Sequence, residues 1–214
     1  MFKILLLFAL VGFGAWNWKS GNVAKTAFDA QGKPIVQVFT FDECGKVCAD
    51  YLAQLKRRRV PFEEINVSTA AANSAGMKTW KQLRTNTFPA LLTGREFVVG
   101  PNKRALIAAL TKNFDDEYLL PIERRYFPKH FDAAGKPGLV LYTASWCPAC
   151  KTLKNDLRTA GMAYTEVEVD GNSDKSLIRE AMEVRGYPTV YVGYDMVAWN
   201  DLAAMRAAMK GGAS

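Results

Sequence analysis

Two cysteines separated by two residues follow an apolar stretch in the last third of the chain. Residues 139–142 read Leu-Val-Leu-Tyr, residues 145–151 read Ser-Trp-Cys-Pro-Ala-Cys-Lys, and a helical pattern comes next. Residues i and i+3 of a helix lie on one face, near enough for a disulfide. The N–H groups at a helix start stabilise a thiolate, and Pro148 suits the first helical position. The pattern predicts that Cys147 attacks a disulfide and Cys150 resolves the mixed intermediate.

The same spacing also occurs in zinc sites, in haem attachment and in structural bridges. Zinc normally needs a second pair of ligands, and haem attachment needs a histidine after the second cysteine, where this chain has Lys151. The downstream stretch 186–192, Gly-Tyr-Pro-Thr-Val-Tyr-Val, places a proline directly before an apolar, β-branched strand. This context favours redox chemistry over the other uses.

Together, these residues resemble the thioredoxin/glutaredoxin superfamily, in which a cis-proline faces the redox cysteine. The resemblance implies that Tyr187 and Pro188 pair with the backbone of the substrate and that Trp146 is a substrate-facing aromatic. A redox-active Cys147 is expected to be exposed with a lowered pKa, whereas a structural cysteine is inert.

An internal repeat divides the chain. Residues 28–34 recur as 131–137, and alignment up to Cys44 and Cys147 gives eight identities in seventeen positions. Each copy predicts the order β-α-β-α-β-β-α, with a parallel pair from the strand-helix-strand unit and antiparallel strands from the closing hairpin. The predicted fold class is α/β, with two tandem thioredoxin-fold, glutaredoxin-like domains, each a mixed four-stranded sheet with flanking helices.

The predicted boundaries follow from this repeat. Residues 30–112 and 132–212 are the two glutaredoxin-like domains, the first with CxxxC and the second with CxxC. Residues 113–131 are a partly helical linker that packs on one or both domains, and residues 1–19 are a signal peptide or membrane anchor. Only a short turn precedes the first strand of each domain, which favours the compact glutaredoxin version of the fold.

The first domain carries a different cysteine pair. Three residues separate Cys44 from Cys48, and a glycine takes the place of the proline. Residues i and i+4 also share a helix face, so a disulfide is feasible. The carboxylates of Asp42 and Glu43 oppose thiolate formation on Cys44. Three interpretations stay open: a second redox site, a structural disulfide, or a degenerate domain that only binds. The retained step Phe88-Pro89 favours the redox site and makes these two residues candidates for substrate binding.

No cofactor or metal is predicted; glutathione stays open as an alternative, although the residues that usually bind it are largely absent. Glutaredoxins typically hold glutathione with a lysine three residues before the nucleophile and with a Gly-Gly-x-Asp-Asp-like stretch before the last helix. This chain has Ala144 at the first of these positions. Here that stretch, 197–201, keeps only Asp201. The resemblance therefore favours protein thiols and disulfides as partners, together with an unknown redox partner.

The N-terminus predicts export. One lysine precedes the apolar residues 4–16, which are too short for a full span and fit the core of a secretory signal. Trp16 and Trp18 would suit a membrane interface, so an uncleaved membrane tether is a second interpretation beside the cleaved signal. A buried core segment is the third interpretation. The predicted location is extracytoplasmic or periplasmic, with or without a membrane anchor; the alternative is cytoplasmic.

Charge is distributed unevenly. Residues 1–131 hold 19 Lys and Arg against 11 Asp and Glu, and residues 132–214 hold 9 against 10. The sequence contains no basic helical pattern with interleaved aromatics, so nucleic-acid binding is not predicted. The run 56–59 is interpreted as a solvated helix end, and His130, the only histidine, as a surface residue.

The sequence thus predicts a thiol–disulfide oxidoreductase acting on protein disulfides. The alternative is a non-enzymatic tandem thioredoxin-fold interaction module whose cysteine pairs are structural disulfides.

Overall fold

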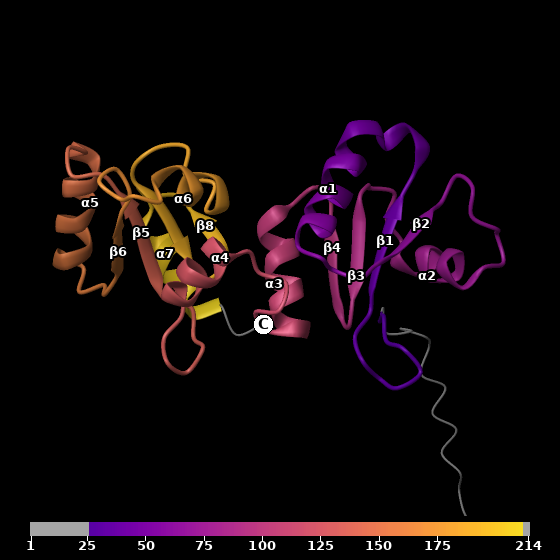
Figure 1. Ribbon diagram of the computed structural model, residues 1–214. Coiled ribbons are helices and arrows are strands. Elements are labelled where there is room, and N and C mark those ends of the chain that lie inside the picture. The colour runs from indigo at the N-terminus through magenta and orange to yellow at the C-terminus, as the bar shows by residue number, and fades with distance from the viewer. Residues whose placement is uncertain (1–25, 212–214) are drawn as a thin grey trace, which may run out of the picture.

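The computed structural model describes residues 26–211, which form two similar α/β units joined by a helical connection (Figure 1). The elements of the first unit are β1 (Val36–Thr40), α1 (Gly45–Arg57), β2 (Glu63–Asn66), α2 (Ala75–Leu83), β3 (Ala90–Thr93), β4 (Glu96–Val99) and α3 (Lys103–Phe114), with a 3₁₀ turn η1 (Asp42–Cys44) before α1. Those of the second unit are β5 (Leu139–Thr143), α5 (Pro148–Thr159), β6 (Thr165–Glu168), α6 (Lys175–Ala181), β7 (Thr189–Val192), β8 (Asp195–Val197) and α7 (Leu202–Gly211). The predicted order of strands and helices is confirmed in both units.

Both sheets have the same topology. Their strand orders are β2-β1-β3-β4 and β6-β5-β7-β8. The first two strands in chain order pair in parallel, and the remaining pairs are antiparallel. The mixed four-stranded sheets therefore agree with the predicted fold class.

The repeated turn before each sheet also has one structure. The Asp29 carboxylate accepts the backbone N–H groups of Gln31 and Lys33, and the Asp132 carboxylate accepts those of Ala134 and Lys136. A β-bridge closes each turn between its phenylalanine and its proline. This matching local geometry explains the sequence repeat.

Helices cover both faces of each sheet. Every residue of β1 and of β5 is buried, as expected for a central strand that is covered on both sides. In the first unit α1 and α3 pack on one face and α2 on the other. In the second unit α5 and α7 pack on one face, and α6 shares the other with the connection between the units. The cysteine pairs lie where α1 and α5 begin.

The connection contains α4 (Pro121–Tyr126) and the 3₁₀ helix η2 (Phe127–His130). Tyr126 and Phe127 belong to the core of the second unit, to which α3 of the first unit contributes Ile107. Figure 1 shows α3 between the two sheets. The connection is thus partly helical and packed, and it joins the units through a shared core.

His130 lies inside this core, so its interpretation as a surface residue is wrong. Its side chain is completely buried, with Nδ1 2.7 Å from the Gly193 carbonyl oxygen and Nε2 2.8 Å from the Tyr142 hydroxyl. Because a carbonyl only accepts, Nδ1 carries the proton and Nε2 accepts from the hydroxyl. Burial lowers the pKa of His130 to about 4. No local pattern reveals this environment, since its partners lie 12 and 63 residues away.

We expect the fold to lose stability as the pH falls from about 6.5 towards 4 because of His130. The unfolded chain takes up the proton near pH 6.5 and the folded chain only near about 4, so protonation favours unfolding within this window. The cost approaches about 3 kcal/mol at the lower end. Urea unfolding of the wild type and of His130→Gln at several pH values measures this cost. The difference between the two proteins isolates His130, because the other titrating groups are common to both. A difference between the two that stays constant from pH 7 to 4 would contradict the prediction.

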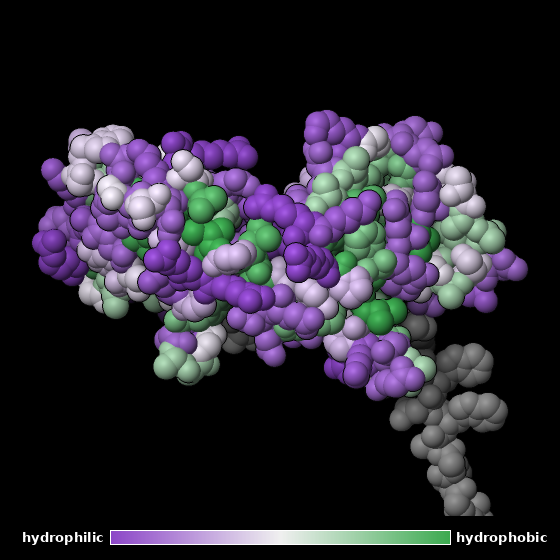
Figure 2. Space-filling model, in the orientation of Figure 1, coloured by the Kyte–Doolittle hydropathy of each residue, from purple (hydrophilic) through white to green (hydrophobic). Residues whose placement is uncertain are grey.

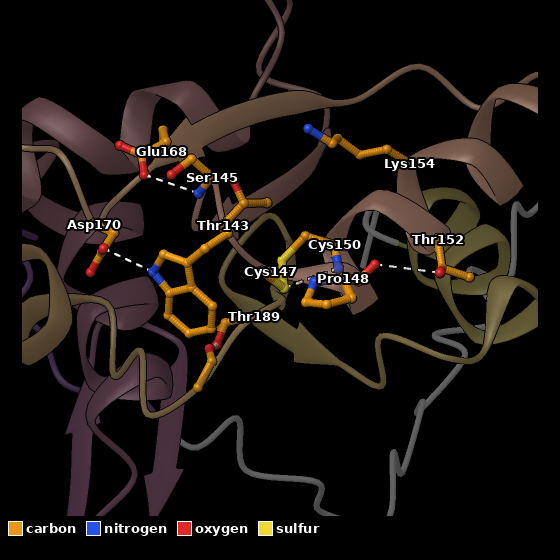
Figure 3. Close-up of a disulfide and its surroundings, with 12 residues drawn as sticks. Thr143, Ser145, Cys147, Pro148, Cys150, Thr152, Lys154, Glu168, Asp170 and Thr189 are labelled. Carbon is orange, nitrogen blue, oxygen red and sulfur yellow. Dashed lines mark hydrogen bonds between the residues drawn. A yellow bond between two sulfur atoms is a disulfide. The ribbon is translucent and has the colours of Figure 1, made fainter.

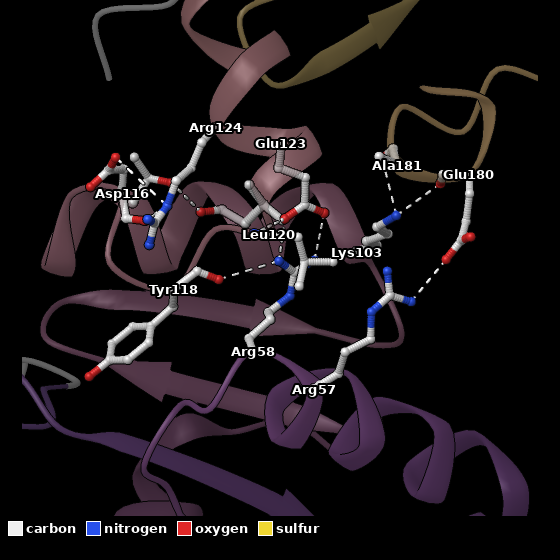
Figure 4. A network of polar contacts seen from close by, with 12 residues as sticks. Arg57, Arg58, Lys103, Asp116, Tyr118, Leu120, Glu123, Arg124, Glu180 and Ala181 are labelled. Carbon is white, nitrogen blue, oxygen red and sulfur yellow. Dashed lines mark hydrogen bonds and ion pairs between the residues drawn. The ribbon is translucent and has the colours of Figure 1, made fainter. Parts of the chain in front are cut away.

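The interpretation of the basic run 56–59 as a solvated helix end fails for Arg58, which is buried against the connection (Figure 4). Its guanidinium forms a bidentate ion pair with Glu123 of α4, and both side chains are almost inaccessible to solvent. The Glu123 carboxylate also accepts the N–H of Leu120 at 3.0 Å. The contact is specific to the tertiary structure, because 65 residues separate the partners.

Three further basic residues of the first unit contact the second. Lys103 Nζ donates to the carbonyl oxygens of Glu180 and Ala181 at the end of α6, at 3.0 and 3.1 Å. Arg57 pairs with Glu180 at 2.9 Å and Arg104 with Glu183 at 3.2 Å. Hydrophilic residues cover much of the junction on the face shown in Figure 2. Part of the basic excess of the first half of the chain therefore serves contacts between the units.

Within residues 26–211 no helix has the length and apolar character needed to cross a membrane. The predicted signal or anchor, 1–19, lies outside the described residues.

Candidate redox site

The second cysteine pair occupies the start of α5, as predicted (Figure 3). Cys147 is the N-cap, Pro148 is the first helical residue, and the N–H of Cys150 donates to Cys147 Sγ at 3.0 Å. The two sulfurs form a disulfide, with the Cα atoms 5.3 Å apart. A helix N-terminus stabilises negative charge, so the same N–H stabilises a thiolate on Cys147 once the disulfide is reduced.

A carboxylate from the neighbouring strand fixes the loop between β5 and α5. Glu168, at the end of β6, accepts the N–H of Ser145 at 3.3 Å and that of Gly171 at 2.9 Å. Parallel pairing of β5 with β6 brings the ends of the two strands together. Glu168 thereby links the cysteine loop to the loop after β6, although the sequence analysis did not single it out.

Trp146 is an exposed large aromatic of the site, with 62% of its surface accessible. Its indole N–H donates to Oδ2 of Asp170 at 2.9 Å. Asp170 also pairs with Lys175 of α6. The Lys175 ammonium, together with the indole N–H, holds the pKa of the Asp170 carboxyl below its usual value. Asp170 lies two residues after the end of β6, and polar residues just beyond a strand parallel to β5 are the signal that could have found it.

Each aromatic-proline step directly precedes the strand, β3 or β7, that pairs with the strand leading to its cysteine helix. Both peptide bonds, Phe88-Pro89 and Tyr187-Pro188, are cis. Tyr187 packs against the buried cluster of Ala144, Cys147 and Cys150. Its ring also meets that of Trp146 edge-on, with centroids 5.9 Å apart. The structure therefore brings Trp146, Tyr187 and the cysteine pair together, as the sequence analysis expected.

The exposure of Cys147 differs from expectation. Only 3% of Cys147 and 1% of Cys150 is accessible in the oxidised protein. Ala149 and Tyr187 pack around the disulfide together with the buried Ala144. A thiol of another protein must displace part of this packing to reach the disulfide.

The first pair forms a disulfide too, with the Cα atoms of Cys44 and Cys48 5.5 Å apart. Cys44 ends η1 and caps α1, yet its side chain accepts no capping hydrogen bond from the described residues. The following Gly45 has φ of 51° and ψ of −130°, a conformation that a residue with a Cβ rarely adopts. The extra residue of CxxxC is thus accommodated by this glycine, and the Cys44 sulfur lacks the N–H that Cys147 Sγ receives.

The stretches that hold glutathione in glutaredoxins have other roles here. The Asp201 carboxylate accepts the N–H of Ala204 at 2.8 Å and so caps α7, as Asn102 caps α3. Ala144 is buried beside the disulfide. In the described part of the chain, no three Cys, His, Asp or Glu side chains gather as metal ligands.

Comparison with known proteins supports the glutaredoxin resemblance for part of the chain. Residues 139–197 match the Glutaredoxin family model. A structure of a buckwheat glutaredoxin–glutathione complex is 26% identical, with a TM-score of 0.27, covering 28% of this chain and 58% of that one. Glutaredoxin C1 from Populus tremula x tremuloides is 20% identical, with a TM-score of 0.32, covering 41% of this chain and 97% of that one. The comparison with curated proteins gave no match.

Residues 139–197 therefore form a glutaredoxin-like domain, and the chain carries two tandem thioredoxin-like α/β domains. The family match lies in the second unit, whereas the first is assigned by its topology. Two close cysteine pairs, each at a helix start, give the protein the components of thiol redox chemistry.

Proposed function

We propose that the protein is a thiol–disulfide oxidoreductase whose second unit exchanges disulfides with other proteins. The observation that carries the proposal is the hydrogen bond from the Cys150 N–H to Cys147 Sγ at the N-terminus of α5. Once the disulfide is reduced, a sulfur in this position is a stabilised thiolate. The same stabilisation makes it a good leaving group when it departs from a mixed disulfide, as redox cysteines require.

In the reductive direction Cys147 is the nucleophile. Its thiolate attacks one sulfur of a substrate disulfide, and the other substrate sulfur leaves as a thiolate. The Cys150 thiolate then attacks Cys147 Sγ, which releases the second substrate thiolate and restores the Cys147–Cys150 disulfide. Two electrons pass to the substrate, and an external thiol of a redox partner must supply them in the next cycle. Oxidation of a substrate dithiol runs through the same steps in reverse.

Trp146, Tyr187 and Pro188 contact the substrate polypeptide in this proposal. Trp146 is exposed beside the disulfide and Tyr187 packs against it. Protein disulfides are the proposed substrates without a bound cofactor, because Ala144 and the helix cap Asp201 leave few groups for a glutathione carboxylate. The site in the first unit, Cys44 and Cys48 with Phe88 and Pro89, is proposed to exchange thiols as well.

The proposed location is an oxidising compartment outside the cytoplasm, reached through the N-terminal segment. Two closed disulfides in one chain favour it.

The burial of Cys147 favours a second candidate function, an interaction module with structural disulfides. A sulfur with 3% accessibility resembles an inert structural cysteine. The two functions differ in the reduction potential of the pair.

A redox titration separates the two candidates. We expect the Cys147–Cys150 pair to titrate near or above about −200 mV, as labile and catalytic pairs can, whereas structural disulfides lie below about −300 mV. The number of free thiols is counted by mass tagging at each potential, in a Cys44→Ser/Cys48→Ser background. The Cys150→Ser variant should accumulate a mixed disulfide through Cys147. A pair that stays oxidised below about −300 mV and a variant that traps nothing would establish the structural alternative.

A further inference from the structure

Four aromatic rings of the first unit form a continuous ladder next to its cysteine pair. The ring centroids are 5.3 Å apart between Phe39 and Trp80, 4.7 Å between Trp80 and Phe88, and 4.9 Å between Phe88 and Phe41. Phe39 is completely buried, whereas the other three rings are partly exposed. The ladder thus runs from the core to the surface and is held rigid at its inner end.

The outer end of the ladder, Phe41, lies one turn before Cys44 in the chain. The Cys44 N–H donates to the Phe41 carbonyl oxygen at 3.0 Å, so the two residues belong to one turn. The register of β1 with β3 pairs Phe39 with Ala90, and its continuation places Phe41 opposite Phe88. The outermost stacked pair therefore lies at the end of the sheet from which the cysteine helix starts.

The second unit lacks this ladder and provides an internal comparison. The register of β5 with β7 pairs Tyr142 with Thr189, so Ala144 takes the place of Phe41 and Tyr187 that of Phe88. The residue nine positions before the cis-proline is Arg179, where the first unit has Trp80. The aromatic ladder is thus a property of the first site and not of the fold that the two units share.

Near the ladder, both apolar and acidic side chains are exposed to solvent. Cys44 is partly exposed, and Val47, between the two cysteines, is 47% exposed. Asp42 and Glu43 are exposed on the turn that links Phe41 to Cys44. Glu43 forms no ion pair with the described residues. A partner that lies here meets aromatic faces, a disulfide and negative charge together.

We infer that the ladder Phe41–Phe88–Trp80 is a docking site for a polypeptide cysteine that is flanked by an aromatic side chain and a basic residue. The aromatic side chain stacks on rigid rings at little cost in conformational entropy, and the basic residue lies near Asp42 and Glu43. The partner thiolate attacks Cys44 Sγ, the Cys44–Cys48 bond breaks, Cys48 leaves as a thiolate, and a mixed disulfide with Cys44 forms. The inference rests on the proposed thiol exchange and names the substrate class of the first site.

The test isolates Cys44 in the full chain. In the variant Cys48→Ser/Cys147→Ser/Cys150→Ser it is the one remaining thiol. The probes are two peptides, acetyl-Lys-Phe-Cys-amide and acetyl-Lys-Gly-Cys-amide, each carrying thionitrobenzoate on its cysteine as a mixed disulfide. The Cys44 thiolate attacks the peptide sulfur and releases coloured thionitrobenzoate, whose rate of appearance is measured. We expect the phenylalanine peptide to react about tenfold faster, which corresponds to ~1.4 kcal/mol.

Phe41→Ala, which introduces the residue of the second unit, should abolish this preference. The symmetric thionitrobenzoate disulfide should still label the same variant, which shows that Cys44 is still reactive, and its circular dichroism spectrum should match that of the parent, which shows that the unit is still folded. Trp199→Ala is the matched control, since Trp199 is an exposed aromatic of the second unit, and it should keep the preference. Equal rates for the two peptides, or a preference that survives Phe41→Ala, would overturn the inference. A Cys44 that reacts with none of the three reagents would also overturn it, while exchange at Cys147 is judged by its own titration.

Discussion

Cys147→Ser is expected to reduce the exchange activity of the second site to the background rate. The variant keeps the helix start and its Pro148, but a serine hydroxyl is not ionised at neutral pH and forms no disulfide. Turnover of a protein disulfide substrate, assayed in a Cys44→Ser/Cys48→Ser background, measures the loss.

Cys150→Ser is the informative control for this prediction. It retains the nucleophile, so the first exchange should proceed, and the substrate should remain attached to Cys147 because the resolving thiol is missing. If Cys147→Ser retained most of the activity of its background while Cys150→Ser lost it, the assigned roles would be reversed. If both variants kept it, the second pair would not be the site of exchange.

The second large effect concerns the buried contact between the first unit and the helical connection. Arg58→Met is expected to destabilise the protein by about 3–5 kcal/mol, because it leaves the buried Glu123 carboxylate without its partner. The Leu120 N–H, which also binds that carboxylate, does not compensate a full charge. Urea unfolding, monitored by circular dichroism, gives the change in the free energy of unfolding.

Arg57 supplies a matched control for this prediction on the same helix. Its pair with Glu180 is exposed, with more than half of each side chain accessible, so Arg57→Met should cost less than about 1 kcal/mol. The double variant Arg58→Met/Glu123→Leu removes both charges and should recover most of the stability lost in Arg58→Met. Equal, small effects of Arg57→Met and Arg58→Met would show that the buried pair contributes little.

The sequence by itself determined the fold class and the positions of the cysteine pairs. These features depend on local rules: the 103-residue repeat, the alternation of strands and helices, and a cysteine-proline pair that starts a helix. Short-range spacing also predicted that each pair can close, since residues three or four apart on a helix lie on one face. The association of Tyr187 with Cys147 came from the family resemblance and agrees with the structure.

Only the tertiary structure decided which polar residues are buried and which rings meet. In the sequence Arg58 and His130 have the character of surface residues. No local pattern indicates their partners, Glu123 and Gly193, which lie 65 and 63 residues away. The low accessibility of Cys147 and the stacking of Trp80 on Phe88 depend likewise on packing between separate elements. Burial is a property of the assembled core, where the free energy of a charge or ring is set by neighbours that the chain brings together only on folding.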